Sequence, residues 1–315
     1  MTIQIDALSS QVKVGASVRG LTSADIEDPA VVQQLRELWI DHGVVLFRGG
    51  ECNEEFHVRL SKIFGEPTVH PLLKTLPDVH PNLVDIRYNK TSGWLYEVDG
   101  RTLGAWLPWH SDLVYVDRIN RGGILRAICV PRADGETGFI DQISAYATLP
   151  ERLKQRIEGL NVLYKFDIDA SHQKFARSPR LRTIFLGKGN VDTMARNAHL
   201  PRSIHPLVYT QEETGRKVLH LSPWFALGIE GMESPEGDAL LEELAQHITR
   251  VEGAYYHQWQ GGDMVLWDNW RMLHCGAGVE VDDERFLQRT TLLGDYGLGR
   301  FAEPAEIPEG VPVDV

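Results

Sequence analysis

The sequence predicts an α+β protein in which many short strands form a sandwich or barrel and a few helices flank it. Short β-branched and apolar runs recur along the chain between Gly and Pro turns, whereas four segments carry apolar residues at helical spacing. A double-sheet jelly roll is one arrangement that closes such strands around a core. The 315 residues can bury a sizeable core, and because neither a repeat nor a flexible linker interrupts them, we expect one domain over residues 1–315.

Caps and apolar spacing predict the helices. The first begins at Asp28-Pro29, with Asp as the cap and Pro at the first helical position, and the second begins at the cap Asn53 and stops at Gly65. Later helices are expected over residues 151–159 and 235–249. The first two helices carry the apolar residues Val32, Leu35, Trp39, Phe56, Leu60, Ile63 and Phe64.

Runs rich in β-branched and aromatic residues predict the strands. These runs span residues 44–47, 83–88, 124–130, 218–221, 255–259, 264–267 and 290–293. Because they are short and separated by turns, they favour a closed or two-layered sheet structure as the scaffold.

Composition excludes several classes of protein. The net charge of −12, from 44 acidic and 32 basic residues, argues against nonspecific nucleic-acid binding. No apolar run reaches the roughly 18 residues that span a bilayer, and the chain does not begin with a secretion signal, so we expect a cytoplasmic protein with no membrane partner. Cys52, Cys129 and Cys275 are too few and too scattered for a disulfide framework. The oligomeric state stays open, a homo-oligomer included.

Two histidines and a carboxylate form the most informative set of residues: His110, Asp112 and His274. Residues two apart in a strand, or at its end, project to the same side, so the first two can bind one ion from a single short segment. This ligand set is typical of the facial triad that holds a non-haem Fe(II) and leaves one face of the metal open. Taken alone, a His-x-Asp spacing is weak evidence, because such spacings arise by chance and a lone histidine is more often an ordinary hydrogen-bonded or surface residue.

Arg285 and Arg289 follow the third member of this set at 11 and 15 residues. If the segment is extended, their even separation directs both guanidinium groups to one face. Solvated arginines are one interpretation. The other is a pair of planar forks that bind carboxylates inside a pocket.

With these motifs in order, the chain resembles the Fe(II)- and 2-oxoglutarate-dependent dioxygenases of the taurine dioxygenase and 2,4-dichlorophenoxyacetate dioxygenase family. The resemblance covers roughly residues 10 to 297 and implies a double-stranded β-helix, or jelly-roll, core with flanking helices and the metal at its mouth. It rests on Trp109-His110-Ser111-Asp112, Asp134-Gly135-Glu136-Thr137-Gly138-Phe139, Gly262-Asp263-Met264-Val265-Leu266-Trp267-Asp268-Asn269, His274, and Arg285 with Arg289 before Thr290-Thr291.

The resemblance implies a role for each of these side chains. The two histidines and Asp112 would hold Fe(II), and 2-oxoglutarate would chelate the metal through its 2-oxo and C1-carboxylate oxygens. Arg285 and the hydroxyl of Thr137 would bind the other carboxylate of 2-oxoglutarate, and reaction with O2 would release succinate and carbon dioxide. Related halogenases lack the ligand carboxylate, so its presence favours hydroxylation; desaturation or ring formation stays open. A threonine in a glycine-rich turn is otherwise a turn former.

The resemblance also implies a small anionic substrate, whose charged group would face Arg289. His70 resembles a histidine that contacts the sulfonate of taurine, although a His before Pro in a loop commonly makes only local hydrogen bonds. Trp106 stands where taurine dioxygenase has a substrate-contacting asparagine, and Phe225 follows another tryptophan. An aromatic-rich segment at about residues 72–108 is longer than in taurine dioxygenase, and aromatic residues of this kind are either core or pocket wall.

We therefore expect an aryloxyalkanoate-like carboxylate or a sulfonate as the substrate. Two other functions remain to be separated from this one: a hydrolase or isomerase that uses the same triad with another metal, and a noncatalytic jelly-roll binding protein. The first would act without 2-oxoglutarate or oxygen, and the second would bind ligand without releasing succinate. For Cys275, next to His274, a small buried filler is expected rather than a reactive thiol.

Overall fold

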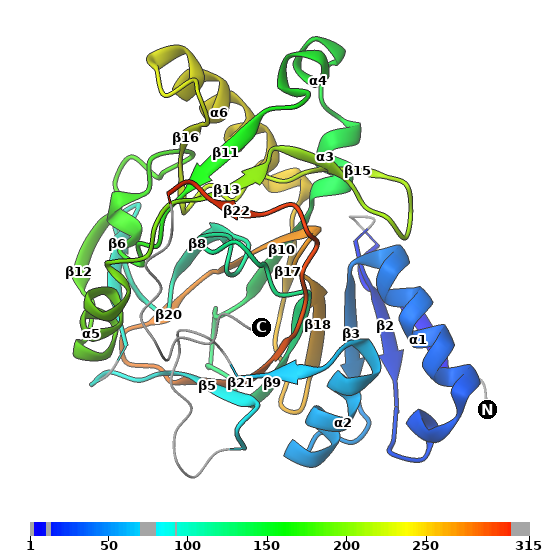
Figure 1. The fold of residues 1–315 in the computed structure, drawn as a ribbon. Helices are drawn as coiled ribbons and strands as arrows, with labels where there is room; N and C mark the ends of the chain where they lie inside the picture. Colours follow the sequence, from blue (N-terminus) through cyan, green and yellow to red (C-terminus); the bar gives the residue numbers. More distant parts are fainter. Residues whose placement is uncertain (1–2, 11–13, 70–79, 92, 304–315) are drawn as a thin grey trace.

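The computed structural model describes residues 3–10, 14–69, 80–91 and 93–303, and within these ranges strands are many and helices few (Figure 1). The predicted mixture of elements is therefore confirmed. In this part of the chain, none of the helices is long and apolar enough to cross a membrane. The predicted contact residue His70, and residues 72–79 of the predicted inserted segment, lie outside the described residues.

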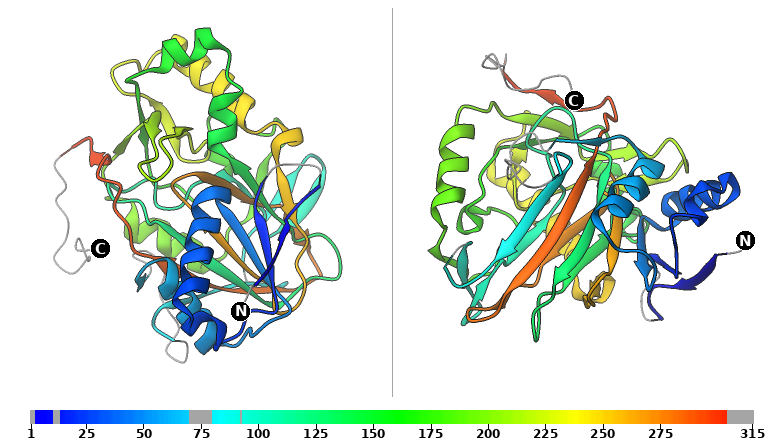
Figure 2. Two further views of the ribbon diagram at one scale, coloured as in Figure 1. Left: turned by 90° about the vertical axis from the view of Figure 1, so that its right-hand side faces the viewer. Right: turned by 90° about the horizontal axis from the view of Figure 1, so that it is seen from below.

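The largest sheet runs in the order β1-β2-β3-β18-β9-β21-β4, and β5 also pairs with β21. Its strands are antiparallel except for the parallel pair β2 and β3. The view from below in Figure 2 shows β5, β21 and β9 side by side. The strands are β1 (Gln4–Ala7), β2 (Ala16–Arg19), β3 (Val44–Arg48), β4 (Pro67–Thr68), β5 (Leu83–Tyr88), β9 (Gly122–Cys129), β18 (Met264–Asp268) and β21 (Arg285–Leu292).

A second sheet, in the order β17-β10-β19-β8, packs against the inner face of the first. Phe139 and Met272 of this sheet share one buried apolar cluster with Leu125, Trp267 and Leu287 of the large sheet. Alternate residues of each strand face this layer, as a half-buried strand requires. The strands are β8 (Leu107–His110), β10 (Thr137–Asp141), β17 (Tyr255–His257) and β19 (Met272–Gly276).

Helices α1 (Pro29–His42) and α2 (Glu54–Phe64) cover the outer face of the large sheet, on the right in Figure 1. The side chains of Asp28 and Asn53 accept hydrogen bonds from the first turn of each helix, which confirms both predicted caps. The left-handed Gly43 ends α1. The stripe of α1 that is fully buried differs slightly from the expected one: Val31 is buried, and Val32 is only half-buried.

The remaining elements lie outside these two sheets. Two more four-stranded sheets run in the orders β16-β11-β13-β22 and β12-β6-β7-β20, and β14 pairs with β15. The strands are β6 (Leu95–Val98), β7 (Arg101–Gly104), β11 (Asn161–Tyr164), β12 (Arg182–Phe185), β13 (Ser203–Pro206), β14 (Val208–Thr210), β15 (Lys217–Leu219), β16 (Ala226–Ile229), β20 (Val279–Glu280) and β22 (Arg300–Phe301). The helices are α3 (Gln142–Ala147), α4 (Glu151–Ile157), α5 (Lys188–Asn197) and α6 (Pro235–Ile248), and the 3-10 helices are η1 (Asp25–Glu27), η2 (Ala170–His172) and η3 (Val251–Gly253).

Several bounds differ from the sequence predictions. Helix α4 ends at Ile157, two residues early, because Gly159 adopts a left-handed conformation with φ of +74°. Strand β21 begins at Arg285, five residues before the predicted start, so both arginines lie within the strand itself. Helices α3 and α5 were not predicted.

Candidate active site

His110 and His274 face each other across two neighbouring strands. The register of β8 and β19 pairs these two residues directly, and their ring centroids lie 4.2 Å apart. Asp112 follows in the turn after β8, with Oδ1 3.6 Å from Nε2 of His110 and Oδ2 3.5 Å from Nε2 of His274. One ligand atom from each residue lies within 4.8 Å of the others, a spacing that suits a single metal ion.

The protonation states of this triad also suit a metal. Nδ1 of His110 donates to the carbonyl of Pro108 at 2.7 Å, which leaves the lone pair of Nε2 facing Asp112. Burial lowers the pKa of His274 to about 3, so its imidazole is neutral at pH 7. Burial alone would raise the pKa of Asp112, but the charge of Arg289, together with the contacts to the two histidines, holds it well below its usual value. The set therefore includes an ionised carboxylate and the neutral imidazole of His274.

The chain after Asp112 adopts a strained conformation. Leu113 has φ of +56°, in the left-handed region. This conformation costs a residue with a side chain roughly 1 to 2 kcal/mol. The turn that carries the carboxylate is therefore held by contacts with other parts of the protein and not by local preference.

Arg285 is a buried cation for which the described residues supply no carboxylate partner. Its Nη2 donates to Oγ1 of Thr137 at 3.1 Å, and its Nε has no hydrogen-bond partner. Burial lowers its pKa to about 10, so it is still charged at pH 7. Thr137 also accepts a hydrogen bond from the indole of Trp259 at 3.0 Å, which leaves its own hydroxyl hydrogen to donate elsewhere. The pair is arranged to receive an anion.

Arg289 lies four residues after Arg285 on the same face of β21, as the even spacing predicted, with Leu287 between the two arginines on that face. Its Nη1 is 2.9 Å from Oδ2 of Asp112, and its guanidinium lies 5.1 Å from the ring centroid of Trp267. Nε and Nη2 are buried without hydrogen-bond partners. This arginine therefore has donors left for a second anion.

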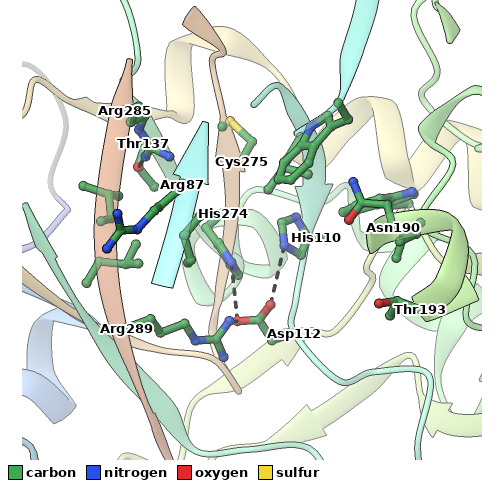
Figure 3. Close-up of a pocket in the computed structure, with 18 of the residues that line it drawn as sticks. Arg87, His110, Asp112, Thr137, Asn190, Thr193, His274, Cys275, Arg285 and Arg289 are labelled. Carbon is green, nitrogen blue, oxygen red and sulfur yellow. Dashed lines mark hydrogen bonds and ion pairs between the residues drawn. The ribbon is translucent and has the colours of Figure 1, made fainter. Parts of the chain in front are cut away.

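All of these groups line one cavity of about 310 Å³ (Figure 3). The structure brings together seven of the nine residues that the sequence singled out, which are His110, Asp112, Thr137, Phe225, His274, Arg285 and Arg289. The lining also contains an aromatic wall that consists of Trp94, Tyr115, Phe166, Trp224 and Phe225.

Trp106 packs against the core, which is one of the two alternatives that the sequence left open, and its contact with substrate stays a prediction. This residue is not among the described residues that line the cavity; its ring packs edge-on against Tyr96 at 5.7 Å. Its main-chain carbonyl accepts a hydrogen bond from the indole of Trp94 at 2.8 Å, and Trp94 is the tryptophan of this segment that reaches the cavity. Ala105, in the turn between β7 and β8, has a left-handed φ of +52°.

Helix α5 contributes a polar wall that sequence reasoning missed. Asn190 and Thr193 line the cavity from this helix, on the side of the triad away from the arginines (Figure 3). The hydroxyl of Thr193 is bound within α5, to the carbonyl of Gly189. The helix begins after Gly187, contains Gly189 and carries few apolar residues, so its sequence is typical of a loop; Asn190, directly after Gly189, is the one polar signal.

Cys275 lies beside His274 on β19 and lines the cavity, but its thiol is buried and unreactive. Burial raises its pKa to about 12, so it is protonated at pH 7. This agrees with the expected small filler.

The chain is similar in sequence and in structure to several known proteins. The family model described as "Taurine catabolism dioxygenase TauD, TfdA family" matches residues 5–291. The alpha-ketoglutarate-dependent 2,4-dichlorophenoxyacetate dioxygenase of Burkholderia sp. is 32% identical over 272 residues, 84% of this chain and 86% of that protein. The alkylsulfatase of Acinetobacter baylyi is 28% identical over 295 residues, which cover 91% of this chain and 84% of that protein. The crystal structure of a taurine dioxygenase from Burkholderia xenovorans superposes with a TM-score of 0.71 at 28% identity and covers 96% of each chain.

Proposed function

Because the chain belongs to the taurine catabolism dioxygenase TauD, TfdA family and is an alpha-ketoglutarate-dependent dioxygenase, we propose that it uses Fe(II) and O2 to hydroxylate a small organic anion with an apolar body. The observation that carries this proposal is that one cavity contains both the His-Asp-His triad and Arg285, a buried arginine to which the described residues offer no anionic partner. A metal ion would bind to the triad, and a carboxylate would pair with the arginine.

His110, Asp112 and His274 fit the metal. Their ligand atoms converge, Nδ1 of His110 is bound to the Pro108 carbonyl so that Nε2 is the atom left for a metal, the imidazole of His274 is neutral, and no thiolate takes part, which favours Fe(II) over structural zinc. Bound Fe(II) and 2-oxoglutarate would supply the oxidising chemistry, with succinate and carbon dioxide as by-products. The retained carboxylate of Asp112 favours hydroxylation.

Arg285 and Thr137 fit the far carboxylate of 2-oxoglutarate. The planar guanidinium can bind a carboxylate through two nitrogens, and the free hydroxyl hydrogen of Thr137 adds a third donor. Trp259 fixes the orientation of that hydroxyl. In a buried site these donors also exclude water from the cosubstrate.

Arg289 and the walls of the cavity would bind the substrate. The unpartnered nitrogens of Arg289 would receive its anionic group, and the aromatic wall, with Trp94, Trp224 and Phe225, would cover an apolar body. Asn190 offers an amide to a polar group on the opposite side. Two relatives carry names that refer to alkyl sulfates and 2,4-dichlorophenoxyacetate, which are anions with apolar bodies.

We further propose that the two facing sheets are the halves of a jelly roll and that the chain forms one dioxygenase domain. Support comes from the strand order β17-β10-β19-β8 facing the large sheet across a shared core, and from a family match that extends over most of the chain. The triad and both arginines would then lie at one end of the two-sheet core.

A succinate-release screen tests the proposal. The protein is incubated with Fe(II), ascorbate, 2-oxoglutarate and O2, and with aryloxyalkanoates, alkyl sulfates, sulfonates and amino acids in turn. We expect an aryloxyalkanoate or alkyl sulfate to stimulate succinate release and to be hydroxylated. Conversion of a substrate without 2-oxoglutarate, or ligand binding with no succinate from any candidate, would overturn it.

A further inference from the structure

The side chain of Asn269 binds the main chain of Asp112 from both sides. Its Oδ1 accepts the hydrogen bond of the Asp112 N–H at 2.8 Å, and its Nδ2 donates to the Asp112 carbonyl at 3.0 Å. Asn269 is fully buried. The two hydrogen bonds reproduce those that one strand residue exchanges with its partner in an antiparallel pair.

The surroundings allow only one orientation of the Asn269 amide. Nδ2 lies 3.1 Å from the carbonyl oxygen of Asn120 and 3.0 Å from its Oδ1, in addition to the Asp112 carbonyl. A flipped amide would place its oxygen against three oxygens and its NH2 against the Asp112 N–H. The direction of both hydrogen bonds to Asp112 is thus fixed.

Asn269 itself lies in the tight turn that joins β18 to β19. Its N–H donates to the Arg121 carbonyl at 3.0 Å, and the turn is closed by the N–H of Arg271 donating to the Asp268 carbonyl at 3.2 Å. Strand β19 then carries His274, which pairs with His110. One turn therefore links the peptide of Asp112 to the strand of a histidine of the triad.

The Asp112 carboxylate has few other supports. Among the described residues its charged contacts are with His110, His274 and Arg289, and the residue that follows it, Leu113, has the left-handed φ of +56°. A leucine does not favour this conformation, so an external contact must hold the turn. The Asn269 amide is placed to do so.

We propose that Asn269 is a positioning residue that holds the peptide of Asp112 so that its carboxylate points at the metal. This inference rests on the proposed metal-binding role of Asp112. Without the two hydrogen bonds the turn relaxes, the carboxylate loses its fixed direction, and the metal is bound more weakly although all three ligands are present.

The test is a titration with Co(II), which binds the same nitrogen and oxygen ligands and is followed by its visible absorption. We expect Asn269→Ala to weaken Co(II) binding by about ten-fold or more, within the range found when partners of metal ligands are removed. The matched control is Asn120→Ala: Asn120 is also buried and contacts the Asn269 amide, yet its loss leaves both hydrogen bonds to Asp112 in place. Both variants should lose thermal stability, but the control should bind Co(II) nearly as the wild type does.

A double-mutant cycle separates positioning from general damage. Asp112→Ala removes the carboxylate and keeps the peptide, so adding Asn269→Ala should then cause no further loss of Co(II) affinity. Equal Co(II) affinities in Asn269→Ala and Asn120→Ala, or an additive loss in the double variant, would overturn the inference. Asn269→Ser, a smaller change, is measured in the same way if Asn269→Ala folds poorly by circular dichroism. By contrast, wild-type affinity in Asp112→Ala would contradict the proposed function itself.

Discussion

Nη1 of Arg289 lies 2.9 Å from Oδ2 of Asp112, the same oxygen that is 3.5 Å from Nε2 of His274. One carboxylate oxygen thus faces both the candidate metal position and the cation proposed to bind substrate. Because the pair is largely buried, the two positive charges compete for it with little screening by solvent. We therefore expect occupancy of the proposed substrate site to affect the strength of metal binding.

Removing the charge of Arg289 should therefore strengthen metal binding and weaken substrate binding. In Arg289→Met, which keeps an unbranched apolar side chain but removes the charge, we expect Co(II) to bind roughly ten-fold tighter, about 1.4 kcal/mol, because the competing cation is gone. Stimulation of succinate release by anionic substrates should fall at the same time. Unchanged or weaker Co(II) binding in this variant would show that the arginine does not compete with the metal.

Removing Arg285 should affect 2-oxoglutarate and not the choice of substrate. Arg285→Ala is expected to raise the 2-oxoglutarate concentration required for half-maximal succinate release, because loss of a buried fork for a carboxylate typically costs about 2 to 5 kcal/mol. Lysine should rescue only partly, since it cannot form two parallel hydrogen bonds. If the requirement for 2-oxoglutarate is unchanged and only substrate use suffers, the two arginines have been assigned the wrong way round.

Thr137→Val should have a smaller effect of the same kind. The substitution keeps the size of the side chain and removes the hydroxyl that accepts from Arg285 and Trp259. We expect the 2-oxoglutarate requirement to rise by a factor that corresponds to about 1 to 2 kcal/mol. Steady-state succinate release at varied 2-oxoglutarate measures it; a loss equal to that of Arg285→Ala would mean that the whole pocket has collapsed.

Trp94 and Trp106 form a matched pair for testing the aromatic wall. Only Trp94 lines the cavity, and the hydrogen bond between them uses the main chain of Trp106, so Trp106→Ala preserves it. Trp94→Ala should reduce use of an aryloxyalkanoate by about ten-fold, from the loss of roughly 1 to 2 kcal/mol of apolar contact, and affect taurine much less. Trp106→Ala should lower the melting temperature without changing this ratio. A change of ratio in Trp106→Ala alone would contradict the assigned wall.

We expect the stability of the fold to depend on pH because of a buried histidine outside the site. His57 of α2 donates from Nε2 to the Ile124 carbonyl, and burial lowers its pKa to about 3. Below about pH 6.5 the unfolded chain takes up a proton that the folded protein does not bind, so stability falls by up to about 1.4 kcal/mol per pH unit as the pH drops towards 3. Above pH 6.5 this dependence vanishes. In denaturant unfolding between pH 6 and 4, His57→Gln should show a shallower slope, whereas a substitution of the exposed His42 should not.

Local chemistry explains how much of the fold the sequence could predict. The caps Asp28 and Asn53 bind the next few residues, so the sequence correctly predicts where both helices start. The predicted strand over residues 83–88 has the same bounds as β5. The even spacing of the two arginines correctly put them on one face of a strand. Such features depend on residues near one another in the chain.

The errors concern features that depend on residues far apart. Helix α5 has a weak apolar pattern, with Gly187 as its cap and Gly189 in its first turn, yet it lines the cavity and supplies Asn190. The left-handed conformation of Ala105, next to Trp106, is one that no sequence rule favours. The role of Asn269 could not be predicted from the sequence, because its contact with Asp112 joins residues 157 positions apart.

The most direct test of the central claim is an anaerobic titration with Fe(II) and 2-oxoglutarate, followed by visible absorption, because a 2-oxo acid chelated to Fe(II) gives a charge-transfer band. We expect this band in the wild type only when both are added. His274→Ala should give no band yet retain the wild-type circular dichroism spectrum, and Arg285→Ala should reach the full band only at higher 2-oxoglutarate. Absence of the band in the wild type, or a full band in His274→Ala, would contradict the assignment of the triad and its cosubstrate.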